Sequence, residues 1–210
     1  MDGNRCRRSP RPTPGAKIIT LDALITDLTS GDESLAEAAM KALIEEGEDA
    51  LAVLEDLLDS PDPDHRWWAL STAAQIESVD ADWLIAALDD ESVIVQQAAA
   101  LGLAGRPCPE AATALTDALR SPDSMLVTLA TNALTAIGAD AVPALLAFWA
   151  RPEQKNTARL GAIRALAEIA DVRAISVLME ASEDDSALIA HWAEKGLENL
   201  GLDMVYMNLD

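Results

Sequence analysis

The stretch DESLAEAAMKAL, residues 32–43, sets a pattern that the chain repeats with drift. Related stretches begin at Asp62, Asp90, Asp123, Lys155 and Ser186. A small residue stands ten positions after each start: Ala42, Thr72, Ala100, Ala133, Ala165 and Gly196. These residues are separated by intervals of 30, 28, 33, 32 and 31. Six matches at nearly constant spacing predict a fold built from internal structural repeats.

Each repeat is predicted to contain two helices. The leading aspartate can accept an orphan backbone N–H at the start of the second helix, and Pro63 suits the first helical position. Glycines are typical of helix ends, and here they are Gly47, Gly105, Gly138 and Gly201. No single unit can bury its apolar stripe alone, so the units should stack. We therefore predict an all-α, right-handed α-solenoid of about six helix pairs.

The solenoid, an α-α superhelix, should cover residues 18–210 and end in a capping segment, residues 202–210. Residues 1–17 carry five basic residues and one acidic residue and are rich in proline. They show no apolar periodicity, which is typical of a disordered tail. The sequence thus predicts one folded domain, residues 18–210, preceded by a disordered, basic, Pro-rich tail, residues 1–17.

Three stretches carry a family resemblance: DPDHRWWALSTAAQI (62–76), DSMLVTLATNALTAIG (123–138) and ADAVPALLAFW (139–149). They resemble the short HEAT-like repeats, of about 30 residues, named after phycobilisome lyase subunits. The resemblance implies the helical-repeat fold and says little about function. The family pattern has an arginine in the fifth place, which only Arg66 and Arg159 match, so it implies ion pairing between units at these two places.

Charge and cysteine content limit the choice of partners. The net charge is −21, and because residues 1–17 contribute +4, the rest of the chain carries −25. So acidic a body repels nucleic acid and anionic membranes, which favours a neutral or basic protein or peptide. No uninterrupted apolar run reaches the roughly 18 residues of a membrane span. Cys6 and Cys108 show no disulfide framework, so we expect a reducing, cytoplasmic location.

Two adjacent tryptophans suggest a binding surface. On a helical wheel with 100° per residue, the recurring positions His65, Ala69, Thr72, Ala73 and Ile76 are predicted to face the core. Trp67 and Trp68 fall off this stripe. In the families that the chain resembles, second helices line a concave groove. That resemblance implies a groove lined by Trp67, Trp68, Ser71, Val95, Gln96, Leu103, Leu129, Asn132, Leu160, Arg164, His191 and Trp192.

Exposed apolar patches and tryptophans are typical of protein interfaces. Packing against the adjacent unit is an alternative for Trp67, Trp68, Leu129 and Trp192. No residue pattern points to catalysis: the two histidines stand in His65-Arg66 and His191-Trp192, whereas HEAT-like di-iron enzymes use His-Glu dipeptides. We therefore expect no catalytic residue, metal or cofactor. The main hypothesis is a non-catalytic interaction scaffold with an acidic groove, and the alternative, from resemblance alone, is a bilin lyase-type subunit that handles a linear tetrapyrrole.

Overall fold

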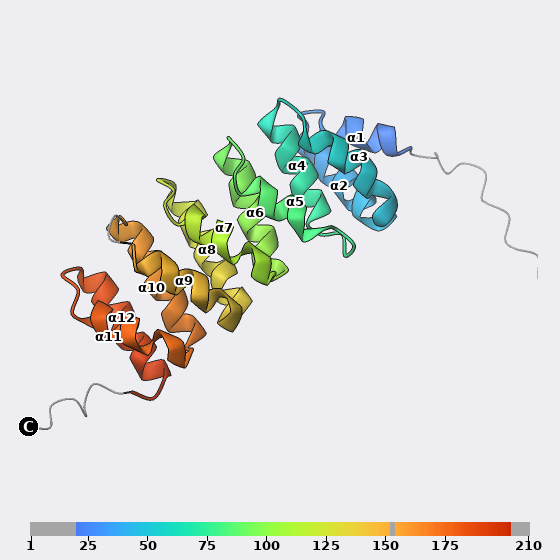
Figure 1. Ribbon diagram of the computed structural model, residues 1–210. Coiled ribbons are helices and arrows are strands. Elements are labelled where there is room, and N and C mark those ends of the chain that lie inside the picture. Colours follow the sequence, from blue (N-terminus) through green and yellow to red (C-terminus); the bar gives the residue numbers. More distant parts are fainter. Residues whose placement is uncertain (1–19, 152–153, 203–210) are drawn as a thin grey trace, which may run out of the picture.

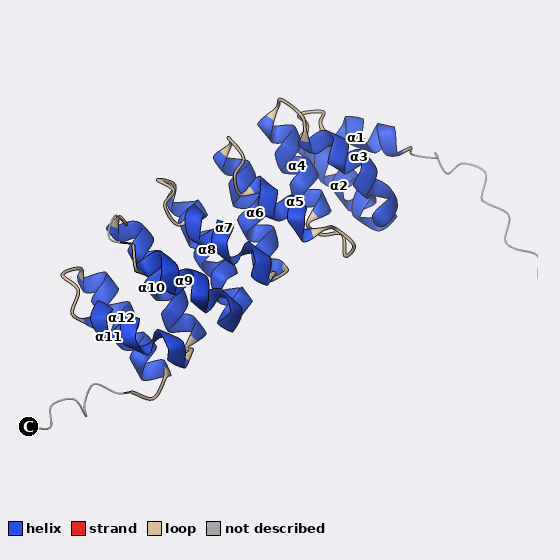
Figure 2. Cartoon of the chain, viewed as in Figure 1, coloured by secondary structure: helices blue, strands red, loops and turns tan. Residues whose placement is uncertain are grey.

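The computed structural model describes residues 20–151 and 154–202, and over these ranges the regular structure is entirely helical (Figures 1 and 2). The first helices of the pairs are α1 (Leu21–Leu28), α3 (Glu48–Leu58), α5 (Ala81–Ala87), α7 (Ala112–Ala118), α9 (Val142–Trp149) and α11 (Ile175–Ser182). The second helices are α2 (Glu33–Glu46), α4 (Pro63–Ala73), α6 (Val93–Gly105), α8 (Ser124–Ile137), α10 (Asn156–Ile169) and α12 (Ala187–Asn199). Short 3₁₀ turns precede three of the first helices: η1 (Pro109–Ala111), η2 (Gly138–Ala141) and η3 (Val172–Ala174).

The six pairs follow one another along a single stack, from the blue end of Figure 1 to the red end. This arrangement confirms the predicted all-α solenoid of six helix pairs. The predicted tail, residues 1–17, and nearly all of the predicted capping segment, residues 202–210, lie outside the described residues.

The second helices share one core register, counted from the N-cap residue. The seventh position after the N-cap is a buried alanine in every described unit: Ala39, Ala69, Ala99, Ala130, Ala162 and Ala193. The eleventh is also buried in every unit: Leu43, Ala73, Leu103, Leu134, Leu166 and Leu197. A small side chain at the seventh position lets the backbones approach closely. The leucine that stands at the eleventh position in five of the six units fills the space between them.

This register corrects the predicted start of the third repeat. Asp32, Asp62 and Asp123 accept backbone N–H groups at the starts of their helices, as predicted. The N-cap of α6, however, is Ser92 and not Asp90. The tenth positions then become Ala42, Thr72, Gly102, Ala133, Ala165 and Gly196, at even spacings of 30, 30, 31, 32 and 31 residues.

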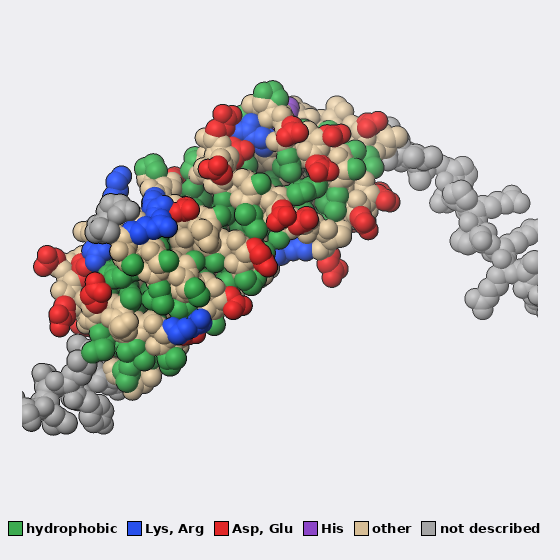
Figure 3. All heavy atoms as spheres, in the orientation of Figure 1, with side chains coloured by type: hydrophobic (Ala, Val, Ile, Leu, Met, Phe, Trp, Pro, Cys, Tyr) green, Lys and Arg blue, Asp and Glu red, His purple; other side chains and the backbone are tan. Residues whose placement is uncertain are grey.

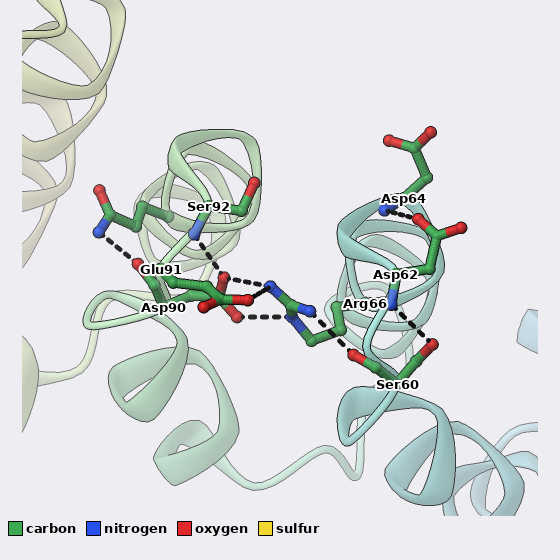
Figure 4. Close-up of polar contacts among 8 residues, drawn as sticks. Ser60, Asp62, Asp64, Arg66, Asp90, Glu91 and Ser92 are labelled. Carbon is green, nitrogen blue, oxygen red and sulfur yellow. Dashed lines mark hydrogen bonds and ion pairs between the residues drawn. The ribbon is translucent and has the colours of Figure 1, made fainter.

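Asp90 joins two units instead of capping a helix. Its carboxylate accepts two hydrogen bonds of 2.8 Å from the Arg66 guanidinium, and Arg66 also donates to the Ser60 carbonyl at 2.8 Å (Figure 4). Burial opposes ionisation of Asp90, but the bonds from Arg66 and from the Ser92 N–H lower its pKa below the ordinary value. Arg159 likewise pairs with Asp184 of the next unit at 2.6 Å. Both ion pairs implied by the family resemblance are therefore present.

Between α10 and α12 the approach is closest at Gly196. A Cβ built on Gly196 would lie 2.9 Å from the Ala167 Cα and 3.0 Å from a Leu178 methyl group. Since real Cβ atoms do not approach backbone atoms so closely, glycine is required here by space and not by backbone conformation.

All four predicted glycines stand at or next to a helix end, and three of them have a positive φ. Gly47, Gly138 and Gly201 have positive φ angles of 62°, 73° and 76°. Gly105, by contrast, lies within the last turn of α6 and has no positive φ. In the fifth unit the equivalent residue is Ala170, whose φ of 53° and ψ of 45° are left-handed.

Replacing Ala170 with glycine should therefore stabilise the fold. The left-handed region costs a residue with a Cβ about 1–2 kcal/mol. Glycine gives back about 0.4–1 kcal/mol through the greater freedom of the unfolded chain. We expect a net gain of about 0.5–1 kcal/mol in the free energy of unfolding, measured by chemical denaturation. Ala38→Gly, in the exposed middle of α2, is the control and should lose about 1 kcal/mol. A loss of stability at both sites would contradict the assigned strain.

By length and composition, one apolar stretch, Ser124–Trp149, could cross a membrane. In the structure it is not one straight helix, because α8 ends at Ile137 and Gly138 turns the chain into η2 and α9. Leu134 and Leu145, from the two halves of the stretch, are fully buried in the core of the solenoid.

Candidate partner-binding face

Three positions of the second helices, the fifth, sixth and ninth after each N-cap, lie off the shared core positions, although the sixth is buried in two units, at Ala98 and Gly161. We call these residues the second-helix face. The fifth positions are Glu37, Trp67, Gln97, Thr128, Leu160 and His191. The sixth are Ala38, Trp68, Ala98, Leu129, Gly161 and Trp192. The ninth are Lys41, Ser71, Leu101, Asn132, Arg164 and Lys195.

This face lies on the more tightly packed layer of the solenoid. Every adjacent pair of second helices packs together, whereas adjacent first helices contact each other much less. In a curved stack of helix pairs, the layer whose members are closer lies on the inner side. The second-helix face thus has the position of the extended concave surfaces that solenoids use for binding.

Most of the predicted groove residues lie on this face. They are Trp67, Trp68, Ser71, Leu129, Asn132, Leu160, Arg164, His191 and Trp192. Their position follows from the repeat register, and their role in binding stays a prediction.

Three predicted groove residues, all from the third unit, are misplaced. Val95 and Leu103 are only 1% and 0% exposed and belong to the core, so their assignment to the groove was wrong. Gln96 lies one position away from the face and donates to the Asp90 carbonyl at 2.7 Å. The physical reason is the start of α6 at Ser92, which shifts this unit by two residues.

Sequence reasoning missed the true face residues of the third unit. Leu101 is 61% exposed and stands at the ninth position of α6. Two signals in the sequence could have found it. The intervals of 28 and 33 residues are uneven, and the misaligned register puts Gln97 where the other units have alanine.

His65 was also placed wrongly, since it was predicted to face the core. It is half-exposed, its Nδ1 lies 3.3 Å from the Ser60 hydroxyl, and its Nε2 lies 3.6 Å from the Asp62 carboxylate. His65 lies in the first turn of α4 and lines a cleft shared with the α1–α2 loop and α2, so its side chain is reached by solvent.

Aromatic and basic side chains meet at the C-terminal end of the face. The Arg164 guanidinium lies 5.4 Å from the centre of the Trp192 ring, and the Lys195 ammonium lies 4.6 Å from it. Arg164 also donates to the Asn132 side chain at 3.4 Å and to Glu168 at 3.0 Å. These contacts join three consecutive units. They hold a half-buried indole and two basic groups at the surface, an arrangement typical of interaction hot spots.

The N-terminal end of the face is different, because it opens into an acidic cleft of about 640 Å³. Trp67 and Trp68 line it with their rings edge to face, 4.8 Å between centres and at 80°. Both rings are half-buried. Trp67 packs against the larger hydrophobic cluster, which runs from Leu70 to Leu197, and Trp68 packs against the smaller N-terminal cluster, which runs from Leu24 to Val79. Both rings therefore pack partly against neighbouring units, as the alternative held, and both remain accessible from the cleft.

No arrangement for catalysis is evident in the part of the chain that the structure describes. It contains no group of three or more His, Cys, Asp or Glu side chains placed to hold a metal ion. Carboxylates are scattered over the surface, as the face shown in Figure 3 illustrates. What the second-helix face offers is a continuous row of side chains with aromatic sites at both ends.

Family models match two parts of the chain: HEAT repeats over residues 81–159 and the PBS lyase HEAT-like repeat over residues 158–184. The chain is a HEAT-like repeat protein. A comparison with curated protein sequences gives no significant match.

Solved structures similar to this HEAT-like chain include proteins of different activities. Human deoxyhypusine hydroxylase is 20% identical, with a TM-score of 0.52, over 86% of this chain and 73% of the other. The complex of CpcE and CpcF of phycocyanin lyase from Nostoc matches at 22% identity and a TM-score of 0.52, over 90% and 81%. A designed armadillo repeat protein in complex with the peptide (KR)4 matches at 19% identity and a TM-score of 0.51, over 85% and 98%. At these identities, the likeness extends to the fold alone.

Proposed function

We propose that this HEAT-like repeat chain is a scaffold that binds a peptide or protein along its second-helix face. The observation that carries the proposal is the row of ninth-position side chains, in which the 61% exposed Leu101 stands between Ser71 and Asn132. A partner that covers Leu101 would remove its apolar surface from water, which is favourable.

The ends of the row support the same function. Trp192, held between Arg164 and Lys195, would supply an aromatic anchor at one end, and the Trp67–Trp68 pair would supply one at the other. Truncating a hot-spot tryptophan costs about 2 kcal/mol or more of binding free energy. The similar fold of a designed armadillo repeat protein in complex with the peptide (KR)4 supports a peptide as the kind of partner.

Site-specific photo-crosslinking tests this proposal. A benzophenone amino acid at Leu101 should yield a discrete crosslinked product in extract of the source cells, and mass spectrometry identifies the partner. Met179, which is 41% exposed on the first helix α11, is the matched control. Products at position 179 but none at position 101 would place the binding surface on the other layer.

A second candidate function is that of a lyase-type subunit that handles a linear tetrapyrrole. The observations that favour it are the match to the PBS lyase HEAT-like repeat model and the fold shared with the phycocyanin lyase complex. Mixing the purified chain with a bilin and recording the absorption spectrum separates the two candidates. A red-shifted, saturable spectrum supports the tetrapyrrole function, and an unchanged spectrum at high protein concentration leaves the scaffold.

A further inference from the structure

The acidic cleft at the N-terminal end of the face carries a more specific inference. It lies between the loop that joins α1 to α2, the start of α2 and the first turns of α4. Five of its lining residues carry carboxylates: Asp32, Glu33, Glu37, Asp62 and Asp64. No lysine or arginine is among the described residues that line it. His65 is the one lining residue that can become positively charged.

Two of these carboxylates are explained by the fold. Asp32 accepts the Leu35 N–H at the start of α2, and Asp62 accepts the Asp64 N–H at the start of α4. The Glu33, Glu37 and Asp64 carboxylates cap no helix, and none of them makes a hydrogen bond or ion pair with another described side chain. Like charges gathered without a counter-ion repel one another, so the cleft favours a bound cation.

The two tryptophans decide what kind of cation fits. Indole rings attract an ammonium or guanidinium group that lies over their face, by about 0.5–1 kcal/mol when exposed and about 2 kcal/mol when desolvated. They also cover the aliphatic stem of a long basic side chain. A bare metal ion would gain nothing from the half-buried rings of Trp67 and Trp68. Carboxylates from both α2 and the start of α4 lie in the same cleft as the two indoles, and together they match the two parts of an arginine or lysine.

We propose that the Trp67–Trp68 cleft binds an arginine or lysine side chain of a basic segment in the partner. This proposal rests on the proposed function and specifies one end of the binding face. Glu37 and Trp67 occupy the same fifth position in adjacent second helices, so they stand side by side along the path of an extended peptide. The partner's chain would enter at the acidic cleft and continue past Ser71 and Leu101 towards Trp192.

The test uses the full chain and a synthetic (KR)4 peptide as the probe, with binding measured by calorimetry. Trp67→Ala should weaken the probe at least tenfold, and so should the double variant Glu37→Gln/Asp64→Asn. The second variant removes charge without disturbing a cap or a buried ring. Glu45→Gln/Glu46→Gln, also on α2 but outside the cleft, makes the same change in net charge and should alter the affinity less than twofold.

Three outcomes would overturn the proposal. If the control variant weakens the probe as much as the cleft variant, the peptide senses only the overall charge of −25 carried by residues 18–210. If removing residues 1–17 tightens the probe tenfold or more, the occupant is the chain's own arginine-rich segment and not a partner. Failure of the proposed scaffold function would give a different result, because Trp192→Ala would then leave the affinity for the natural partner unchanged. If Trp192→Ala loses partner binding but Trp67→Ala leaves the affinity for the probe unchanged, the cleft proposal is wrong and the scaffold function stands.

Discussion

Replacing Arg66 with leucine should lower the free energy of unfolding by about 3 kcal/mol, the lower end of the range for breaking a buried ion pair. Arg66 is 7% exposed and spans two units, with Asp90 on one side and the Ser60 carbonyl on the other. Leucine would leave the Asp90 carboxylate without its counter-ion and the carbonyl without a donor. We expect a loss at the lower end of this range because the Asp90 side chain is still 14% exposed, so water screens part of its unpaired charge.

Chemical denaturation measures this effect, and Arg151→Leu is its control. The Arg151 side chain is 51% exposed and lies 4.0 Å from the exposed Asp117 carboxylate, so this variant should stay within about 0.5 kcal/mol of the wild type. Equal losses in the two variants would show that Arg66 is no more than a surface residue.

The same ion pair predicts a pH dependence. The pKa of Asp90 is lower in the folded chain than its ordinary value of 3.8. Its contribution to stability is therefore present above that value and is lost as the pH falls through the folded pKa. The stability difference between wild type and Asp90→Asn should be full at pH 7 and shrink as the pH falls below about 4 towards the folded pKa, because only below that pKa are both forms uncharged at this site. A difference that stays constant down to pH 2 would contradict the assigned pairing.

Two leucines of α6 provide the second large effect. Leu103→Ala should lower the free energy of unfolding by about 2–5 kcal/mol, because it removes a fully buried side chain and leaves a cavity. Leu101→Ala, two residues earlier on the same helix, should change it by no more than about 0.5 kcal/mol. The substitution is chemically identical, so the difference reports burial alone.

Thermal and chemical denaturation of these two variants test the corrected register directly. If α6 followed the register that starts at Asp90, the costly substitution would be Leu101→Ala instead. A similar loss in both variants would mean that neither register describes the helix.

Much of the fold could be predicted from the sequence because its determinants are local and repeated. Asp32, Asp62 and Asp123 cap their helices as expected, and the alanine at the seventh position recurs in every unit. The third unit failed for a physical reason. An aspartate can cap a helix or pair with an arginine of the preceding unit, and the local sequence does not show which of these roles it takes. Asp90 pairs with Arg66, and that contact spans 24 residues of sequence.

The site was less predictable than the fold. A helical wheel gives directions on one helix, and it placed Trp67 and Trp68 off the core stripe, where the structure has them. It says nothing about neighbouring units, so it could not show that both rings pack partly against them. Nor could it show that Glu33 and Glu37 face the two rings across a cleft, because these residues come from a different helix pair.

The central claim is that the second-helix face binds the partner, and Trp192 tests it most directly. The measurement is the affinity, by calorimetry, of the partner captured through position 101 for wild type, Trp192→Ala and Met179→Ala. We expect Trp192→Ala to lose about 2 kcal/mol of binding free energy, roughly thirtyfold in Kd, and Met179→Ala to stay within about twofold. An unchanged Kd for a folded Trp192→Ala, or an equal loss in Met179→Ala, would contradict the account.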